Sequence, residues 1–139
     1  MRATQKSLRI PAAIVQAIEE LATANRRDFS ASAVELLTEA VHMRRCPGIV
    51  FADGPTGRRA RLAGTGLDVW EVIATLRSVE GHPERLRQAY PWLTPAQLRA
   101  ALGYYELFPE EIDWRIARND EWTPERVRSQ YPSLTADLK

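Results

Sequence analysis

Three polar residues at alternate positions near the amino terminus carry the clearest chemical signal in the sequence. Gln5, Ser7 and Arg9 alternate with residues that include Leu8 and Ile10. Successive side chains of a strand point to opposite faces, so the polar three would share one face and the two aliphatic residues the other. Amide, hydroxyl and guanidinium groups hydrogen-bond to base edges in the DNA major groove, which admits a two-stranded ribbon. The spacing therefore predicts a strand that contacts DNA bases.

Residues typical of enzyme active sites do not gather in this sequence. His42 and His82 are far apart, and neither has metal-ligand spacing with Cys46. Adjacent carboxylates such as Glu110 and Glu111 would point in different directions on a helix. The seven glycines are scattered rather than grouped in a phosphate-binding loop. We expect no catalytic residues, no metal site and no cofactor.

The predicted strand over residues 5–10 needs a partner. An isolated strand leaves a row of backbone donors and acceptors unpaired, and a two-stranded ribbon is marginal unless helices cover one of its faces. Two copies that pair antiparallel, each followed by covering helices, would meet both requirements. We therefore expect a homodimer with a two-stranded ribbon made of one strand from each chain.

Two amphipathic helices are predicted after this strand. Pro11 suits the first turn of a helix, where a missing N–H costs nothing. Asp28 or Ser30 can cap the second helix. Apolar residues recur at helical spacing in both segments. The positions expected to be buried are Ile14, Ile18, Leu21 and Ala22 in the first helix and Ala33, Leu37, Ala40 and Val41 in the second.

The start of the second helix has the features of a phosphate clamp. Backbone N–H groups at a helix amino end, with the helix dipole behind them and arginines beside them, suit an anion. Residues 1–45 hold seven Lys/Arg and five Asp/Glu, a net charge of +2 per chain and +4 per dimer. This modest charge fits a protein that reads one site rather than a general nucleic-acid coat. The candidate DNA-binding residues are Gln5, Ser7, Arg9, Arg26, Arg27, Phe29 and Ser30.

Residues 3–45 resemble the ribbon-helix-helix repressors and antitoxins. The resemblance rests on Leu8-Arg9-Ile10-Pro11 and on Phe29-Ser30 at the start of the second helix. It implies a dimer that binds promoter DNA through its ribbon. The alternative is an ordinary strand and helical hairpin packed on the rest of the chain.

A second small domain is predicted over residues 47–108. Strand-like runs at 48–52 and 59–62 flank a turn-rich stretch, which indicates a β-hairpin. Asp68 can cap the helix that follows. The domain is therefore expected to combine a hairpin with several helices.

A short helix from Pro83, a turn and a longer helix from Thr94 resemble a helix-turn-helix. Thr94 and Gln97 have the spacing of a capping box. The outward positions of the longer helix are expected to include Gln97, Arg99, Ala100, Gly103 and Tyr104. Because only one of these is cationic, the pattern favours a domain for dimer packing or partner binding over a DNA reader.

Residues 48–108 also resemble a small family of uncharacterised domains found in bacterial antitoxins. The resemblance rests on Leu-Ala-Gly-Thr-Gly-Leu-Asp-Val at 62–69 and on Tyr-Pro-Trp-Leu-Thr at 90–94. Many relatives place an arginine directly after Gly-Thr. This chain has Gly66 there, so any contact made by that arginine is missing.

The tail, residues 109–139, repeats an earlier part of the chain. Residues 83–94 recur at 124–135, with eight of twelve positions identical, but no long helix follows the second copy. The tail is either a helix and a helical cap packed on the body, or a segment that binds a partner protein through aromatics and arginines. The candidate partner-binding residues are Trp114, Arg115, Arg118, Trp122, Arg126, Arg128 and Tyr131.

Composition sets the remaining bounds. With 139 residues, 45% hydrophobic and 27% charged, the chain has room for one domain or two small ones. No apolar run approaches the roughly 18 residues of a membrane-spanning helix, and no signal-peptide core is present, so a cytoplasmic location without a membrane partner is expected. Cys46 cannot form an internal disulfide and is expected to be a linker residue.

Together these patterns predict a mainly α fold with short β elements. The predicted parts are a ribbon-helix-helix domain (1–46), a β-hairpin plus helix-turn-helix-like domain (47–108) and a helical tail (109–139). The resemblances imply an antitoxin of the VapB type that represses its own promoter as a homodimer. They also imply that it neutralises a PIN-like ribonuclease toxin. The tail arginines would bind the clustered carboxylates of the toxin's active site. Two alternatives are a stand-alone dimeric transcriptional regulator and an adaptor that uses the ribbon only to dimerise.

Overall fold

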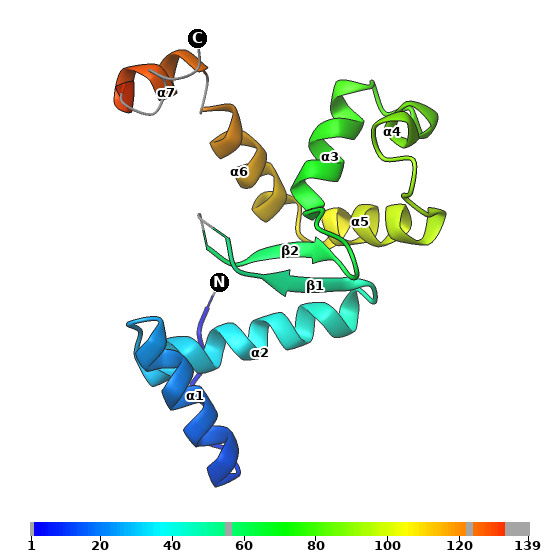
Figure 1. Ribbon diagram of the computed structural model, residues 1–139. Coiled ribbons are helices and arrows are strands. Elements are labelled where there is room, and N and C mark those ends of the chain that lie inside the picture. Colours follow the sequence, from blue (N-terminus) through cyan, green and yellow to red (C-terminus); the bar gives the residue numbers. More distant parts are fainter. Residues whose placement is uncertain (1, 55–56, 122–123, 133–139) are drawn as a thin grey trace. The chain divides into compact units, whose positions relative to one another are not determined.

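The computed structural model describes residues 2–54, 57–121 and 124–132, and the chain divides into two compact units, Met1–Arg45 and Cys46–Lys139 (Figure 1). The described residues are mainly helical, with one two-stranded antiparallel sheet. Within those ranges no helix is both long and apolar enough to cross a membrane. Each unit is described separately below.

Unit 1 is a helical hairpin preceded by an irregular segment. Its helices are α1 (Ala12–Ala24) and α2 (Phe29–Arg45). Pro11 lies one residue before the first helical position, where its carbonyl oxygen accepts hydrogen bonds from the N–H groups of Ile14 (3.0 Å) and Val15 (3.1 Å). Asp28 caps α2, because its Oδ1 accepts from the Ala31 N–H at 2.7 Å. A short turn containing Arg26 in the left-handed region (φ 54°) joins the helices.

Residues 2–10 belong to no helix or strand. The sequence predicts a strand over 5–10, but in a single chain no described segment pairs with it. A strand exists only beside another strand that accepts and donates its backbone hydrogen bonds. The segment is therefore irregular in one copy of the chain.

Unit 2 contains the hairpin that the sequence predicts. Strand β1 (Ile49–Ala52) pairs antiparallel with β2 (Arg59–Leu62), and Ile49 lies opposite Leu62. The helices that follow are α3 (Val69–Ser78), α4 (Pro83–Ala89), α5 (Pro95–Leu107), α6 (Pro109–Asp120) and α7 (Pro124–Gln130). The hairpin prediction is confirmed.

Helix α5 lies at the centre of unit 2. It packs against α3, α6 and both strands (Figure 1). Its Tyr104 is fully buried, and the Tyr104 hydroxyl donates a 2.6 Å hydrogen bond to Oε2 of Glu111 on α6. Residues from every element between β1 and α6 supply the core around it, including Ile49, Leu62, Val69, Val72, Leu86, Leu98, Ala101 and Ile112.

Side-chain caps fix the helix starts. At α5, Thr94 Oγ1 accepts from the Gln97 N–H (3.1 Å) and Gln97 Oε1 accepts from the Thr94 N–H (2.9 Å), so the predicted capping box is confirmed. At α3, Glu71 Oε2 accepts from the Asp68 N–H at 2.8 Å. These local bonds satisfy amide groups that a helix leaves unpaired at its first turn.

The Gly-Thr motif forms the bend between β2 and α3. Thr65 Oγ1 donates to the Leu62 carbonyl (2.8 Å) and accepts from the Leu67 N–H (3.0 Å). Gly64 has a φ of +75°, which L side chains rarely adopt. The motif therefore serves to turn the chain sharply between two core elements.

The prediction for Cys46 is wrong, because this residue is buried in the core of unit 2 and is not a linker residue. Of the two interpretations of the tail, the structure bears out packing on the body for residues 109–120. Ile112 and Ile116 of α6 belong to the core of unit 2, and α6 packs against α3 and α5.

An exposed polar cluster joins α3, α5 and α6. Arg77 Nη2 donates to Asp113 Oδ1 (2.5 Å) and to the Tyr105 hydroxyl (2.6 Å), and that hydroxyl donates to Asp113 Oδ1 (2.9 Å). The hydrogen bond from Arg77, followed by that from Tyr105, lowers the pKa of the Asp113 carboxyl below its ordinary value. The same hydrogen bond to Asp113 raises the pKa of Arg77.

We expect Asp113→Asn to lower the melting temperature of the protein slightly near neutral pH. Because the folded-state pKa is depressed, the ionised carboxylate stabilises the fold above its unfolded-state pKa of about 4, and this contribution is lost as pH falls through the lower folded-state value. Thermal unfolding followed by circular dichroism from about pH 7 to pH 2.5 should show a difference between variant and wild type that shrinks towards zero. An equal difference at both ends of the range would contradict this.

Candidate nucleic-acid and partner-binding surfaces

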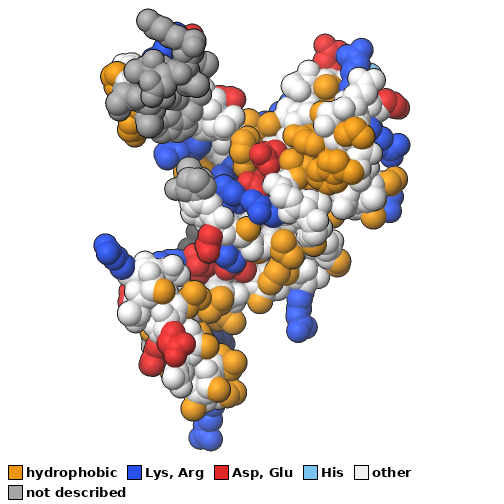
Figure 2. All heavy atoms as spheres, in the orientation of Figure 1, with side chains coloured by type: hydrophobic (Ala, Val, Ile, Leu, Met, Phe, Trp, Pro, Cys, Tyr) orange, Lys and Arg blue, Asp and Glu red, His pale blue; other side chains and the backbone are white. Residues whose placement is uncertain are grey.

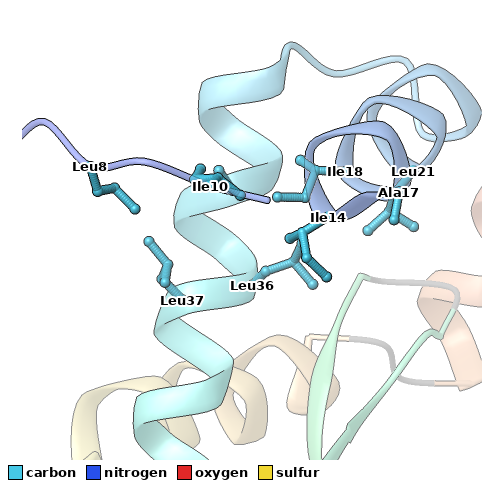
Figure 3. Close-up of a pocket in the computed structure, with 9 residues that line it drawn as sticks. Leu8, Ile10, Ile14, Ala17, Ile18, Leu21, Leu36 and Leu37 are labelled. Carbon is cyan, nitrogen blue, oxygen red and sulfur yellow. The ribbon is translucent and has the colours of Figure 1, made fainter. Parts of the chain in front are cut away.

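Unit 1 contains an open apolar hollow of about 460 Å³. Figure 3 shows side chains from the amino-terminal segment, α1 and α2 converging on it. Every lining residue is apolar: Leu8, Ile10, Ile14, Ala17, Ile18, Leu21, Ala33, Leu36 and Leu37. Leu8 and Ile10 thus lie on the helix side of their segment, as their alternation predicts.

The apolar side chains of unit 1 are largely uncovered in a single chain. Leu8 is 64% exposed, Leu37 58% and Ile14 51%, whereas Ile18 and Ala22 are buried. Figure 2 shows hydrophobic side chains reaching the surface over α1 and α2. The prediction that Leu21, Leu37, Ala40 and Val41 are buried, together with Ile14, is wrong for one copy of the chain. Two helices alone cannot surround so wide an apolar face.

The predicted base-contacting residues are accessible. Gln5, Ser7 and Arg9 are all exposed, in contrast to Ile10, which is half-buried. The segment that carries them is held to the helices by its aliphatic residues, which line the hollow. Its polar side chains are free of the unit's interior and open to a ligand.

The predicted phosphate clamp is only partly assembled. Ser30 is exposed and Phe29 half-buried, but the Asp28 carboxylate occupies the amino end of α2, where an anion was expected. Arg27 Nη1 forms a 2.6 Å ion pair with Glu35, and Arg26 is exposed. An exposed pair of this kind contributes about 0 to 1 kcal/mol, so a phosphate can compete with Glu35 for Arg27. The clamp remains a prediction.

Three of the candidate partner-binding residues come together on α6. Trp114 is 51% exposed, and the guanidinium carbons of Arg115 and Arg118 lie 5.3 and 5.1 Å from its ring centroid. Arg115 Nη2 also donates to the carbonyl oxygen of Arg58, at 2.6 Å. The spacing of four residues places Arg118 beside the Trp114 ring on the helix. Arg115 is the adjacent residue, and its long side chain reaches the same ring. The result is an accessible aromatic ring flanked by two cations.

The remaining tail candidates lie on or near α7. Arg126 Nη1 donates to the Glu121 carbonyl oxygen at 3.3 Å, while Arg128 and Tyr131 are exposed. Trp122 lies outside the described residues. Among the described elements, α7 packs against no other helix or strand. The predicted set is therefore divided between α6, which belongs to the core, and α7, which does not.

An ion cluster surrounds Asp68, for which the sequence predicted only a helix-capping role. Arg61 Nε donates to Asp68 Oδ1 at 3.0 Å, and Trp70 Nε1 donates to Oδ2 at 3.2 Å. Arg59 Nε lies 2.8 Å from Oδ2, an ion pair in which the N–H is not directed at the oxygen. The only sign of this cluster in the sequence was the spacing of Arg59 and Arg61, which places both side chains on one face of a strand. Both arginines of β2 pair with the one carboxylate that begins α3, so the cluster holds the hairpin to α3.

Helix α5 does not present the surface that a recognition helix needs. Of the predicted outward positions, Arg99 is exposed, but Tyr104 is fully buried and Gln97 is engaged in the cap. One side of the helix packs against α3, α6 and the hairpin, and its other side is exposed. In the ranges described, no three His, Cys, Asp or Glu side chains are placed to share a metal ion.

Comparison with known proteins gives a match for unit 2. Residues 49–105 match the model of a family described as "Protein of unknown function (DUF433)". The chain is also similar to a crystal structure of a DUF433 member protein from Anabaena variabilis, with 36% sequence identity over 60% of this chain and 81% of that one, and a TM-score of 0.44. No curated protein matches the chain.

We expect the protein to be a dimer at micromolar concentration and Leu37→Glu to disrupt it. The exposed apolar face of unit 1 needs cover, and a buried leucine stabilises by roughly 2 kcal/mol, while a buried unpaired charge costs more. Light scattering after size-exclusion chromatography should give the dimer mass for wild type and a monomer or an unfolded chain for Leu37→Glu. Thr23→Glu, at an exposed polar position on α1, is the matched control and should remain dimeric. A folded wild-type monomer would contradict this expectation.

Proposed function

We propose that this protein is an antitoxin that binds promoter DNA as a ribbon-helix-helix dimer and neutralises a PIN-like ribonuclease through its carboxyl-terminal helices. The observation that carries the proposal is the apolar hollow of unit 1, to which Leu8 and Ile10 contribute. The same segment that needs a pairing strand also carries aliphatic residues on one side and exposed polar residues on the other. A second copy satisfies both needs at once.

Burial favours a second copy as the cover for this face. Unit 1 has 45 residues, and units of that size rarely bury enough apolar surface to fold without a partner, a metal or disulfides. The sequence has one cysteine, Cys46, which lies just after unit 1 in the core of unit 2, so no disulfide can form within unit 1. Antiparallel pairing of residues 5–10 across a two-fold axis would satisfy their backbone groups and bring Leu8, Ile10 and their copies over the helices.

DNA recognition follows from the outer face of that ribbon. Gln5, Ser7 and Arg9 from each chain would give six hydrogen-bonding side chains in the major groove. Arginine pairs with guanine through O6 and N7, and glutamine with adenine through N6 and N7. The net charge of +4 for two copies of residues 1–45, with Arg26 and Ser30 near the backbone, supports phosphate contacts that position the ribbon.

Toxin neutralisation rests on the resemblance to antitoxins and is supported by individual arginines of α6 and α7, which lie in a segment, residues 109–139, of net charge −2. A ribonuclease that holds magnesium through carboxylates presents concentrated negative charge, which arginine can meet with a permanent charge and bidentate geometry. Arg126 and Arg128 are exposed on α7, and Trp114 lies between Arg115 and Arg118 on α6. The aromatic ring supplies apolar contact that an exposed ion pair alone lacks.

Arg9→Ala and Gln5→Ala should each weaken binding to the protein's own promoter by about 1–3 kcal/mol, roughly 5- to 150-fold, while the dimer remains intact. Fluorescence anisotropy with a labelled promoter fragment measures this. Ser30→Pro should weaken binding to all DNA sequences alike, because it removes a backbone N–H beside a phosphate. Arg99→Ala, an exposed arginine of unit 2, is the control. If it alone abolished binding, unit 2 would be the DNA reader.

Reversing the charge of Arg126 and Arg128 together to glutamate should abolish protection of cells that express the toxin, without affecting promoter binding. The matched control reverses Arg85 and Arg87, which occupy the equivalent positions of the first repeat copy and are also exposed. Cell growth and co-purification of toxin and antitoxin are the measurements. Full protection by the double variant, or by a chain lacking residues 120–139, would rule out neutralisation through α7.

A further inference from the structure

The sequence repeat is also a structural repeat. Residues 83–94 and 124–135 share eight of twelve residues, and each copy forms a seven-residue helix that begins at its proline: α4 (Pro83–Ala89) and α7 (Pro124–Gln130). Each is preceded by a helix that packs into the core, α3 or α6. The α6–α7 pair therefore repeats the order of the α3–α4 pair.

In the first copy, three residues hold α4 to the unit. Leu86 is fully buried, Leu93 is 4% exposed, and Tyr90 is half-buried with its hydroxyl 3.4 Å from Thr75 Oγ1 on α3. Among the described elements, α4 packs against α3 alone. These three side chains are the anchors of α4.

The differences between the copies follow this burial pattern. At the positions of Tyr90 and Leu93 the second copy has the same residue types, at 131 and 134. At the position of Leu86 it has valine, at 127. The other three differences correspond to Gln88, Ala89 and Trp92, all of which are exposed. The second copy thus keeps the residues that a groove of the α3 kind would bury. Nevertheless, α7 packs against no described element, and Tyr131 is 46% exposed.

We propose that α7 of one copy of the chain takes the place of α4 on α3 of a second copy. The same anchor pattern fits the same groove, and every copy of the protein carries that groove. Valine fills less of it than leucine, so α4 is the stronger occupant and the exchanged arrangement is the less populated one. The proposed dimer of unit 1 would keep the second copy at a high local concentration.

The connection between α3 and α4 has an uncommon backbone conformation. Glu80 and Gly81, directly between the two helices, have φ values of 56° and 77°, and a non-glycine residue in the left-handed region is uncommon. Of the described helices and strands, α4 packs against α3 alone. Its exchange would uncover Leu86 and Leu93, which lie in the core of unit 2, so the incoming α7 has to fill the same space.

Docking onto the same chain is disfavoured by reach. Helices α4 and α6 both pack against α3 but not against each other, and Figure 1 shows them on opposite sides of α3. The distance across α3 is two interhelix spacings, about 16–20 Å. Three residues separate α6 from α7, and such a connection spans at most about 14 Å. A second copy has no such restriction.

This arrangement is compatible with the proposed toxin contact. Arg85 and Arg87 flank the buried Leu86 and are exposed, so the equivalent Arg126 and Arg128 would stay exposed when α7 docks. Docking would then fix the arginines in place, while Tyr131 would face the groove rather than the toxin.

Paramagnetic relaxation in mixed samples tests the exchange. The full chain carrying Cys46→Ala and Ser129→Cys is spin-labelled at position 129, which corresponds to the exposed Gln88, and is mixed with an excess of isotope-labelled wild-type chain at several hundred micromolar. We expect the amide signals of Thr75 and its α3 neighbours in the isotope-labelled chain to lose intensity. The effect should increase at least twofold when that chain carries Leu86→Ala, because α4 is then the weaker occupant.

Two comparisons make the result decisive. Val127→Asp in the spin-labelled chain should remove the effect, whereas Gln130→Asp, at a position equivalent to the exposed Ala89, should leave it unchanged. No signal loss in the mixed sample, or loss that Val127→Asp does not alter, would overturn the proposal. Signal loss that appears only when the spin label and the isotope label are on the same chain would also overturn the proposal. Because the concentration is high, the outcome does not depend on whether unit 1 dimerises.

Discussion

Two helices and an irregular segment cannot enclose the apolar side chains that unit 1 carries, and this constraint governs the first third of the molecule. Leu8, Ile14 and Leu37 are more than half exposed in a single chain, around a hollow with no polar lining residue. Exposed apolar surface on this scale is typical of an interface rather than of a free surface. In the proposed dimer, folding, ribbon formation and DNA recognition are one event, since the strand that reads DNA exists only when the core is complete.

Unit 2 meets the same demand within its own chain. Its helix α5 packs against α3, α6 and the hairpin, and Tyr104 joins the core to α6 through Glu111. Asp68 ties β2 to the start of α3 by pairing with two arginines of one strand face. A helix-turn-helix pattern in sequence thus contributes to core packing, because the longer helix buries Leu98, Ala101 and Tyr104. The accessible chemistry of the unit lies instead on α6 and α7.

Local patterns in the sequence were sufficient to predict local structure. The capping box of Thr94 and Gln97 and the hairpin both depend on residues close together in the chain, and both predictions are confirmed. Burial was less predictable. Leu37, Ala40 and Val41 lie on a helix as their spacing predicted, yet the described residues of unit 1 do not cover them.

Long-range packing explains the other differences. Tyr104 was expected to point outward from its position on the predicted recognition helix, but its hydroxyl donates to Glu111, a half-buried residue seven positions later on the next helix. Cys46 looked like part of a linker because Pro47 and Gly48 follow it. In both cases the deciding partner comes from another element, which no residue pattern within the segment itself reports. The cation–π grouping on α6 was partly visible from spacing, whereas its link to Arg58 was not.

The position of Cys46 bears on how such proteins can be recombined. Helix α2 ends at Arg45 and the core of unit 2 begins at the next residue, so the two units share a junction with no spare chain. A chimera that takes unit 1 from one protein and unit 2 from another would have to be joined before Cys46, since a join at Pro47 would replace a core side chain of unit 2.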